Sequence, residues 1–169
     1  MTGRPAAAWR RLDGTVSGVA MDSKTFDLFT RFVYEQSGIS LKKGKEALVS
    51  ARVGKRMRAL GIPDHRTYIR HVMDDASGGE LVHLLDAIST NVTSFYREAA
   101  HFEFLEQVLA EWIQQGQRRF RLWSAACSSG EEPYTMAITA NEAAKGAGVD
   151  LKILATDLST RVLQRCLAG

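Results

Sequence analysis

The sequence predicts an α/β protein of more than one domain: an all-α N-terminal domain, residues 21–88, followed by an incomplete Rossmann-like α/β domain, residues 89–169. Three observations lead to this prediction. Apolar residues recur at helical spacing through residues 24–88. Two short apolar runs of strand type, at 120–123 and 151–154, are each followed by a helical pattern. The net charge also changes sign between the two parts.

Composition sets the broad class. The chain has 169 residues, of which 45% are hydrophobic and 24% charged, as in ordinary soluble domains. It contains no apolar run of about 18 residues, so we expect no membrane insertion. Residues 1–20 hold three arginines but no continuous apolar stretch, which predicts a disordered leader rather than a signal peptide. Two cysteines indicate a reducing, cytoplasmic location, and the four histidines match no metal pattern.

Four helices are expected in the N-terminal domain, at residues 24–37, 45–60, 64–74 and 80–88. Ser23 is the expected cap of the first helix, and Gly38 lies past its end. Gly61 and Pro63 stop the second. The apolar positions of the first two helices are expected to be core: Phe26, Phe29, Phe32, Val33, Val49, Val53, Met57 and Leu60.

Charge divides the chain along the same line. Residues 24–70 hold 11 Lys and Arg against 4 Asp and Glu, a net of +7, whereas residues 71–169 hold 8 against 13, a net of −5. The basic residues concentrate at Lys42, Lys43, Lys45, Arg52, Lys55, Arg56 and Arg58. A solvated helix face is the usual explanation for such a run. Nucleic acid is disfavoured because no aromatic residue interleaves with this charge. An acidic protein partner is the third interpretation.

The most informative segment is W-S-A-A-C-S-S-G-E-E-P-Y, residues 123–134. Small residues after the strand let a ligand approach the backbone, and Pro133 suits the first turn of a helix. Only Gly130 of the dinucleotide glycines is present, and Glu131 and Glu132 stand where phosphates would bind. Two carboxylates favour a cationic ligand such as S-adenosylmethionine (SAM). The alternative is that both acids only offset the helix dipole.

Two further segments fit a ligand site. Asp157 follows the second strand, where an acid usually holds ribose hydroxyls. It could also cap the helix at 158–166, although Ser159 is an equal candidate for that cap. The segment at 89–98, in which polar and aromatic residues alternate, precedes a long amphipathic helix expected at 98–115 and holds five Ser, Thr and Asn residues. A helix N-cap needs only one Ser, Thr or Asn, so the additional polar residues of this segment suggest a hydrogen-bonding lid or wall over a ligand.

Taken together, Thr90–His101, Trp123–Tyr134 and Ala155–Leu163 resemble the chemotaxis receptor methyltransferase (CheR) family, and residues 38–61 resemble its N-terminal helical domain. The resemblance covers about residues 20–169. It implies a SAM-dependent O-methyltransferase that methylates glutamate side chains of chemoreceptors during chemotaxis adaptation. It also implies acidic receptor helices as the partner, no nucleic acid, and a cytoplasmic protein, which we expect to be a monomer.

The resemblance assigns roles residue by residue. SAM contacts fall on Asn91, Thr93, Arg97, Glu132 and Asp157. Glu132 would hold the amino group of the methionine part and Asp157 the ribose. Arg97 would sit at the transfer site, touching either the cofactor carboxylate or the substrate carboxylate. The basic residues that would meet the acidic receptor are Lys45, Arg52, Lys55, Arg56 and Arg58.

A glutamate substrate is already ionised near pH 7, since its ordinary pKa is about 4.3. No general base is then required, in agreement with the absence of a catalytic His or Cys arrangement. The later strands of a methyltransferase sheet are not in this sequence, so we expect a fragment of a longer enzyme or a truncated product. A non-catalytic receptor-binding module is the main alternative. A methyltransferase acting on RNA or a small molecule is a third.

Overall fold

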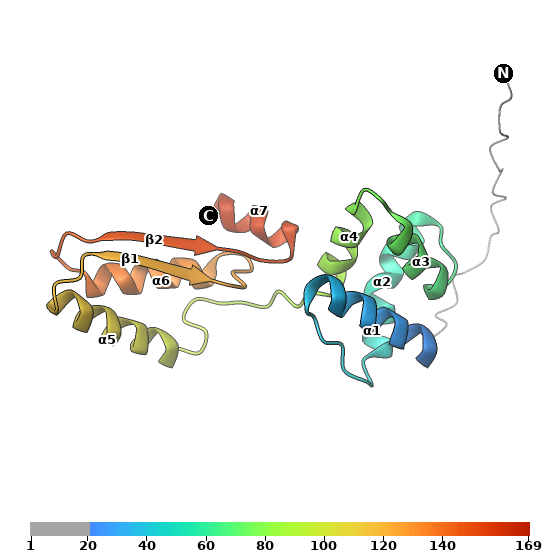
Figure 1. Cartoon of the computed structure of the whole chain (residues 1–169), viewed down its shortest axis with the longest axis horizontal. Coiled ribbons are helices and arrows are strands. Elements are labelled where there is room, and N and C mark those ends of the chain that lie inside the picture. Colours follow the sequence, from blue (N-terminus) through green and yellow to red (C-terminus); the bar gives the residue numbers. More distant parts are fainter. Residues whose placement is uncertain (1–20) are drawn as a thin grey trace, which may run out of the picture.

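The computed structural model describes residues 21–169, and the leader predicted at 1–20 lies outside the described residues (Figure 1). Within that range the chain runs through four helices, a fifth helix, and then a β-α-β-α unit. The helices are α1 (Ser23–Ser37), α2 (Glu46–Leu60), α3 (His65–Asp74), α4 (Gly79–Ile88), α5 (Ala100–Gln114), α6 (Glu131–Ala143) and α7 (Thr160–Ala168). The strands are β1 (Arg119–Ser124) and β2 (Asp150–Ala155).

Helix α1 starts one residue earlier than predicted. Its N-cap is Asp22, whose carboxylate accepts hydrogen bonds from the Thr25 backbone N–H at 3.0 Å and from the Thr25 hydroxyl at 2.6 Å. Ser23 is therefore the first helical residue, and its prediction as the cap is wrong. The reason is that the Asp22 side chain reaches both donors of Thr25 at the N3 position. Gly38 ends the helix with φ of 73°, as a left-handed C-cap.

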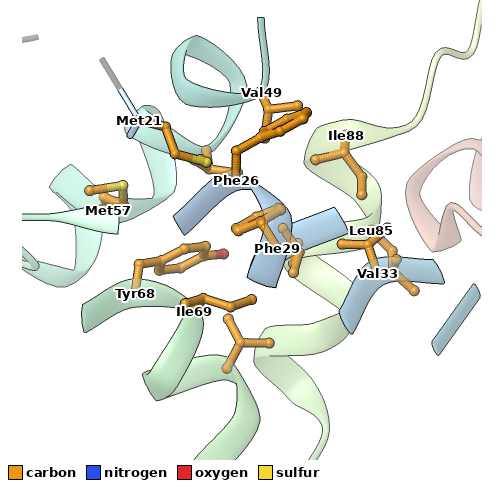
Figure 2. Packing of buried hydrophobic residues seen from close by; sticks show 13 residues of the cluster. Met21, Phe26, Phe29, Val33, Val49, Met57, Tyr68, Ile69, Leu85 and Ile88 are labelled. Atoms are coloured by element: carbon orange, nitrogen blue, oxygen red, sulfur yellow. The ribbon is translucent and has the colours of Figure 1, made fainter. Parts of the chain in front are cut away.

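The four N-terminal helices enclose one apolar core (Figure 2). Each helix contributes side chains that are less than a tenth exposed, and Phe29, Val33, Val53, Tyr68, Ile69 and Leu84 are 0% exposed. Phe32 is only partly buried and packs against this cluster. Leu60 was expected to complete the apolar stripe of α2, but it is 37% exposed. The stripe ends at Met57 because Gly61 turns the chain away immediately after Leu60.

Two arginines of α2 bind helix α4, which runs antiparallel to α2. The Arg56 guanidinium makes a bidentate ion pair with Glu80 in the first turn of α4, with bonds of 2.6–3.0 Å. The Tyr68 hydroxyl donates to the same carboxylate at 3.0 Å. Arg52, about one turn away on α2, donates to the Ile88 carbonyl at 2.6 Å, at the negative end of the α4 dipole.

In the second part, β1 and β2 form a two-stranded parallel sheet with Arg119 opposite Asp150 and Ser124 opposite Ala155. Helix α6 connects the strands, and α5 packs on α6 (Figure 1). The shared core is small: Leu109, Phe120 and Ala140 are buried, with partly buried apolar side chains around them. Parallel pairing brings the carboxyl ends of both strands to one edge, where the predicted ligand turn lies.

Helix α5 begins at Ala100, not at residue 98 as predicted. Glu98 has a left-handed φ of 57°, which a right-handed helix cannot contain. Residues 89–99 link the two parts of the chain, and α4 also touches α7 through a 3.3 Å hydrogen bond from the Thr160 hydroxyl to Asp86. No helix within residues 21–169 is both long and apolar enough to cross a membrane.

Candidate functional site

The turn after β1 lies against the end of β2. The Thr156 N–H donates to the Ser124 carbonyl at 3.0 Å, and the Cys127 N–H donates back to the Thr156 carbonyl at 2.9 Å. These bonds continue the strand pairing into the two loops. Gly130 then turns the chain into α6 with φ of 110°, and a Cβ there would lie 3.0 Å from the ring of Tyr134. Glycine is required at this position by both backbone conformation and space.

A cavity of about 290 Å³ opens beside this turn. All five residues predicted to contact SAM line it: Asn91, Thr93, Arg97, Glu132 and Asp157. They come from three separate segments, namely the linker, the start of α6 and the loop after β2. The structure therefore brings together the residues that the sequence analysis selected, while their individual roles stay predictions.

The two neighbouring acids of α6 lie in different surroundings. Glu132 lines the cavity and accepts a 2.6 Å hydrogen bond from the buried hydroxyl of Ser124. Glu131 does not line the cavity, and its carboxylate accepts a 2.7 Å bond from Ser129 instead. Both carboxylates lie in the first turn of α6, where they oppose the positive end of the helix dipole. Only Glu132 is also placed to meet a ligand.

Asp157 is held by backbone donors. Its carboxylate accepts the N–H of Ser128 at 2.8 Å and the N–H of Ser159 at 2.8 Å. Ser159 occupies the N-cap position of α7 but makes no capping bond with its own side chain. Asp157 thus supports the start of α7 and faces the cavity at the same time, so the two interpretations of this acid are compatible.

Ser128 also lines the cavity, and the sequence analysis did not single it out. It has a left-handed φ of 48°, it is 6% exposed, and its hydroxyl donates to the Asn91 carbonyl at 3.0 Å. Together with its bond to Asp157, this ties the turn, the linker and the β2 loop to one another. A non-glycine residue in this conformation costs free energy, and such residues concentrate at functional sites.

The segment 90–98 forms one wall of the cavity through residues 90–94, 97 and 98, and it does not cap α5. The N-cap position of α5 is Ala99, without a side-chain hydrogen bond. The Arg97 guanidinium donates to the Val92 carbonyl at 2.6 Å, and the Tyr96 N–H donates to the Thr135 hydroxyl at 3.3 Å. Tyr96 has φ of 52°, so the wall also carries left-handed backbone. Glu98, the last residue of the predicted wall, lines the cavity, and so do His101 and Phe102 of α5, for which no role at the site was predicted.

A second cavity, of about 490 Å³, lies between the helical domain and the turn. It shares Thr90, Asn91, Ala126 and Asp157 with the first cavity, so the two adjoin. Its walls are apolar on the side of the helical core and include the cations Lys42, Lys45 and Arg52. Of the five basic residues predicted to bind a receptor, Lys45 and Arg52 line this cavity, whereas Lys55 and Arg58 are exposed on α2.

Arg56, which was predicted to contact a receptor, has an intramolecular partner. Its guanidinium pairs with Glu80, which is only 6% exposed, and its receptor contact stays a prediction. Burial alone would raise the pKa of Glu80, yet the hydrogen bonds from Arg56 and Tyr68 outweigh it and hold the pKa below its ordinary value. The spacing of charges along α2 could not reveal this partner, which lies 24 residues further on.

The chemistry of the first cavity fits SAM. Glu132 and Asp157 place two carboxylates on its lining, and each keeps free lone pairs beyond the bonds described above. A sulfonium and an ammonium group are favoured by such walls, and ribose hydroxyls can donate to a carboxylate. A phosphate would be repelled. Within residues 21–169 no cluster of three or more His, Cys, Asp or Glu side chains could hold a metal ion.

Comparison with known proteins agrees. Residues 24–89 match the CheR methyltransferase all-α domain, and residues 91–169 match the CheR methyltransferase SAM-binding domain. A "Chemotaxis protein methyltransferase" of Salmonella typhimurium is 35% identical over 151 residues, 89% of this chain and 51% of that protein. "Chemotaxis protein methyltransferase 2" of Pseudomonas aeruginosa is 40% identical over 137 residues, 81% of this chain and 48% of that protein.

The chain spans about half the length of the curated relatives it matches. The two domain matches follow one another and together take in nearly all of the described residues. The chain belongs to the CheR methyltransferase family, and the cofactor of its second domain is S-adenosylmethionine.

Proposed function

We propose that this chain provides the cofactor-binding and receptor-contacting parts of a protein-glutamate O-methyltransferase that modifies chemoreceptors. The main support is that Asn91, Thr93, Arg97, Glu132 and Asp157 line one cavity, although they come from three segments of the chain. The names of the relatives add the chemotaxis context. Such a protein would work in the cytoplasm, beside the signalling helices of the receptors.

In this proposal Glu132 binds the amino group of the methionine part, and Asp157 binds the ribose hydroxyls. Bound SAM supplies a methyl group made electrophilic by its sulfonium. The carboxylates hold the ligand because they are fixed before it arrives: Glu132 by Ser124, and Asp157 by two backbone N–H groups. Fixed side chains lose little conformational entropy on binding.

The chain needs no general base for a glutamate substrate, because that carboxylate is ionised near neutral pH. What remains is to orient the carboxylate and to exclude water. Arg97 lines the cavity and spends one N–H on the Val92 carbonyl, which leaves further donors of its guanidinium for a carboxylate. A single such contact orients the nucleophile without fully neutralising it.

The second cavity and α2 suggest how the receptor would be met. Lys42, Lys45 and Arg52 line the cavity that adjoins the SAM cavity, and Lys55 and Arg58 project from the same helix into solvent. Clustered cations raise the encounter rate with an acidic helix. Arg52 and Arg56 already have intramolecular partners, so we assign most of the steering to the exposed lysines and to Arg58.

A receptor-binding module without catalysis is the second candidate. It is favoured by one observation: the outer face of the sheet exposes Trp123 at 63% and Leu154 at 59%, while the basic helical domain has a complete core of its own. A methyl-transfer assay with labelled SAM and receptor membranes separates the two candidates. Transfer supports the enzyme, whereas SAM-independent capture of receptor without transfer supports the module.

The cofactor site is tested by three single substitutions. Glu132→Ala and Asp157→Ala should each weaken SAM binding more than tenfold, about 1.4 kcal/mol or more, because each removes a charged hydrogen-bonding partner. Glu131→Ala is the matched control, since this neighbouring acid does not line the cavity. Calorimetric titration with SAM measures all three. Unchanged affinity in both test variants would remove the case for this site.

The basic face is tested by charge reversal. Lys55→Glu with Arg58→Glu should weaken binding to a glutamate-rich receptor helix roughly threefold to tenfold at low salt, with a smaller effect at high salt. Arg66→Glu with Arg70→Glu makes the same charge change on the exposed side of α3 and serves as the control. If both pairs weaken binding equally, only net charge matters and α2 has no special role.

A further inference from the structure

Two free thiols from different elements lie beside the cofactor turn. Cys127 is 0% exposed in the turn between β1 and α6, and Cys166 is partly exposed near the end of α7. Gly130 lies between them. Its N–H donates to the Cys127 carbonyl at 2.9 Å, and a Cβ built on it would come within 3.1 Å of the Cys166 sulfur. The Cys166 side chain therefore packs directly on the turn that contains Cys127.

The two sulfurs also influence each other. Burial, and after it the neighbouring thiol of Cys166, raise the pKa of the Cys127 thiol to about 11. Cys127 is consequently protonated at neutral pH, so it is not the thiol that peroxide oxidises first. Cys166 is the accessible member of the pair. A partly exposed thiol backed by a buried one is the arrangement in which oxidation of the first is resolved by the second.

We propose that Cys127 and Cys166 form a reversible intrachain disulfide when the protein meets a peroxide, and that this bond weakens SAM binding. The Cys166 sulfur attacks the O–O bond of hydrogen peroxide, which yields a sulfenic acid and one water. The Cys127 sulfur then displaces the hydroxyl group from Cys166, which forms the S–S bond and releases a second water. The two thiols are oxidised, the peroxide is reduced, and an external dithiol reverses the reaction.

The disulfide would affect SAM binding through the residues on either side of Cys127. Ala126 and Ser128, on either side of it, both line the SAM cavity. Ser128 holds the Asp157 carboxylate and the Asn91 carbonyl by hydrogen bonds of 2.8 and 3.0 Å. A disulfide requires a sulfur separation of about 2.05 Å and Cβ atoms about 3.8 Å apart. Because Cys127 lies in the turn itself, the bond acts directly on the segment that holds Asp157.

Helix α7 can shift when the disulfide forms because few contacts hold it to the rest of the chain. Only Val162 among its side chains is buried, and its polar attachments include the Thr160 bond to Asp86 and the bond from the Tyr134 hydroxyl to the Cys166 carbonyl. The effect on affinity rests on the proposed SAM site, whereas the formation of the bond does not. The two parts of the proposal can therefore succeed or fail separately.

The experiment treats the 169-residue chain with hydrogen peroxide and follows it by intact mass and peptide mapping. The expected product has lost two hydrogens, carries a Cys127–Cys166 linked peptide, and returns to the original mass with dithiothreitol. Because the attacking Cys127 must lose its proton, closure should become faster as the pH rises from about 7 to about 9. Addition of oxygen to Cys166 with Cys127 left free, or a disulfide between two chains, would overturn the proposal.

Calorimetry with SAM then measures the consequence. The oxidised chain should bind SAM about tenfold more weakly than the reduced chain, and reduction should restore the affinity. Cys166→Ser is the matched control: it preserves size and polarity, it lies outside the SAM cavity, and its affinity should not respond to peroxide. If the disulfide forms but the affinity is unchanged, the regulatory half is wrong. If the reduced chain does not bind SAM, the proposed function fails while the disulfide result stands.

Discussion

The helical domain and the α/β unit differ in how completely they bury their apolar side chains. In the helical domain, side chains from all four helices meet in a core that includes five fully buried residues from α1 to α3 and Leu84 from α4. In the α/β unit only Leu109, Phe120 and Ala140 form the buried cluster, and Trp123 and Leu154 face solvent from the sheet. Apolar burial is therefore concentrated in the first part, and the candidate site lies in the second.

This contrast explains how the site is built. In the α/β unit the cavity residues are positioned mainly by hydrogen bonds between loops, such as those of Ser128 and Asp157, and less by packing. Loops held in this way are stable enough to organise a ligand and still able to move. The helical domain contributes a rigid neighbour, because Arg52 donates to the Ile88 carbonyl and to the Thr90 hydroxyl at the start of the linker.

The largest effect is expected from Phe29→Ala in the helical core. Phe29 is 0% exposed and packed on all sides, so its loss should destabilise the domain by about 4 kcal/mol. Leu109→Ala in the small cluster should cost only about 2 kcal/mol, because thinly covered sites collapse more readily. Urea unfolding followed by circular dichroism measures both.

Fluorescence separates the two parts. Trp112 and Trp123 lie in the α/β unit, so a Trp9→Phe background leaves emission from that unit alone. Phe29→Ala should move the circular dichroism transition and leave the fluorescence transition nearly unchanged. If both transitions shift by the same amount, the two parts unfold as one cooperative unit. The helical domain and the α/β unit would then differ in packing but not in stability.

The sequence predicted the helices of the first domain closely. The helical spacing of apolar residues and the glycines that end helices are local features, which can be recognised within a few residues. The errors concern residues at or near the ends of helices. Asp22 caps α1 in place of Ser23 because its carboxylate reaches two donors of Thr25. Leu60 fits the apolar stripe but is exposed where the chain turns at Gly61. Glu98 could not be excluded from α5 without knowing its backbone dihedral.

A smaller effect is expected from Arg56→Ala, which leaves the Glu80 carboxylate buried beside Tyr68 without its cation. A broken buried pair usually costs 3–5 kcal/mol, and because Arg56 is 31% exposed we expect about 2–3 kcal/mol here. Arg58→Ala, two residues further along α2 and exposed, should change stability by less than about 0.5 kcal/mol. Thermal unfolding compares them. Equal stability of the two variants would mean that the ion pair between Arg56 and Glu80 does not stabilise the domain, and that Arg56 behaves like the exposed basic residues of α2.

The convergence of Glu132 and Asp157 was predictable because carboxyl ends of parallel strands meet at one edge, and an acid follows each strand. Asn91 lies in the linker, and only the family resemblance pointed to it. Partners distant in sequence were not predictable in this way. Glu80 as the partner of Arg56, and Ser128 as the link between Asp157 and Asn91, depend on tertiary packing and on a left-handed backbone. Spacing along one helix or one loop carries no information on either.

The smallest effect concerns Asp75 before α4. Its carboxylate accepts the N–H of Glu80 at 2.8 Å and both donors of Ser77, and these bonds lower its pKa from 3.8 to about 2. A group with a depressed pKa stabilises the folded state fully above its unfolded pKa and loses that contribution as the pH falls through the folded value. The helical domain should therefore lose stability between about pH 4 and about pH 2.

Asp75→Asn keeps an oxygen acceptor but cannot titrate, so its melting temperature should fall less steeply over this acid range than that of the natural chain. Asp22 and Asp64 also have lowered pKa values through their bonds to Thr25 and Thr67, so the informative quantity is the difference between the two pH curves. Parallel curves would mean that Asp75 contributes no pH-dependent stability. A difference confined to the circular dichroism transition, with tryptophan fluorescence unaffected, would place the acid sensitivity in the helical domain, which is the better-packed part of the molecule.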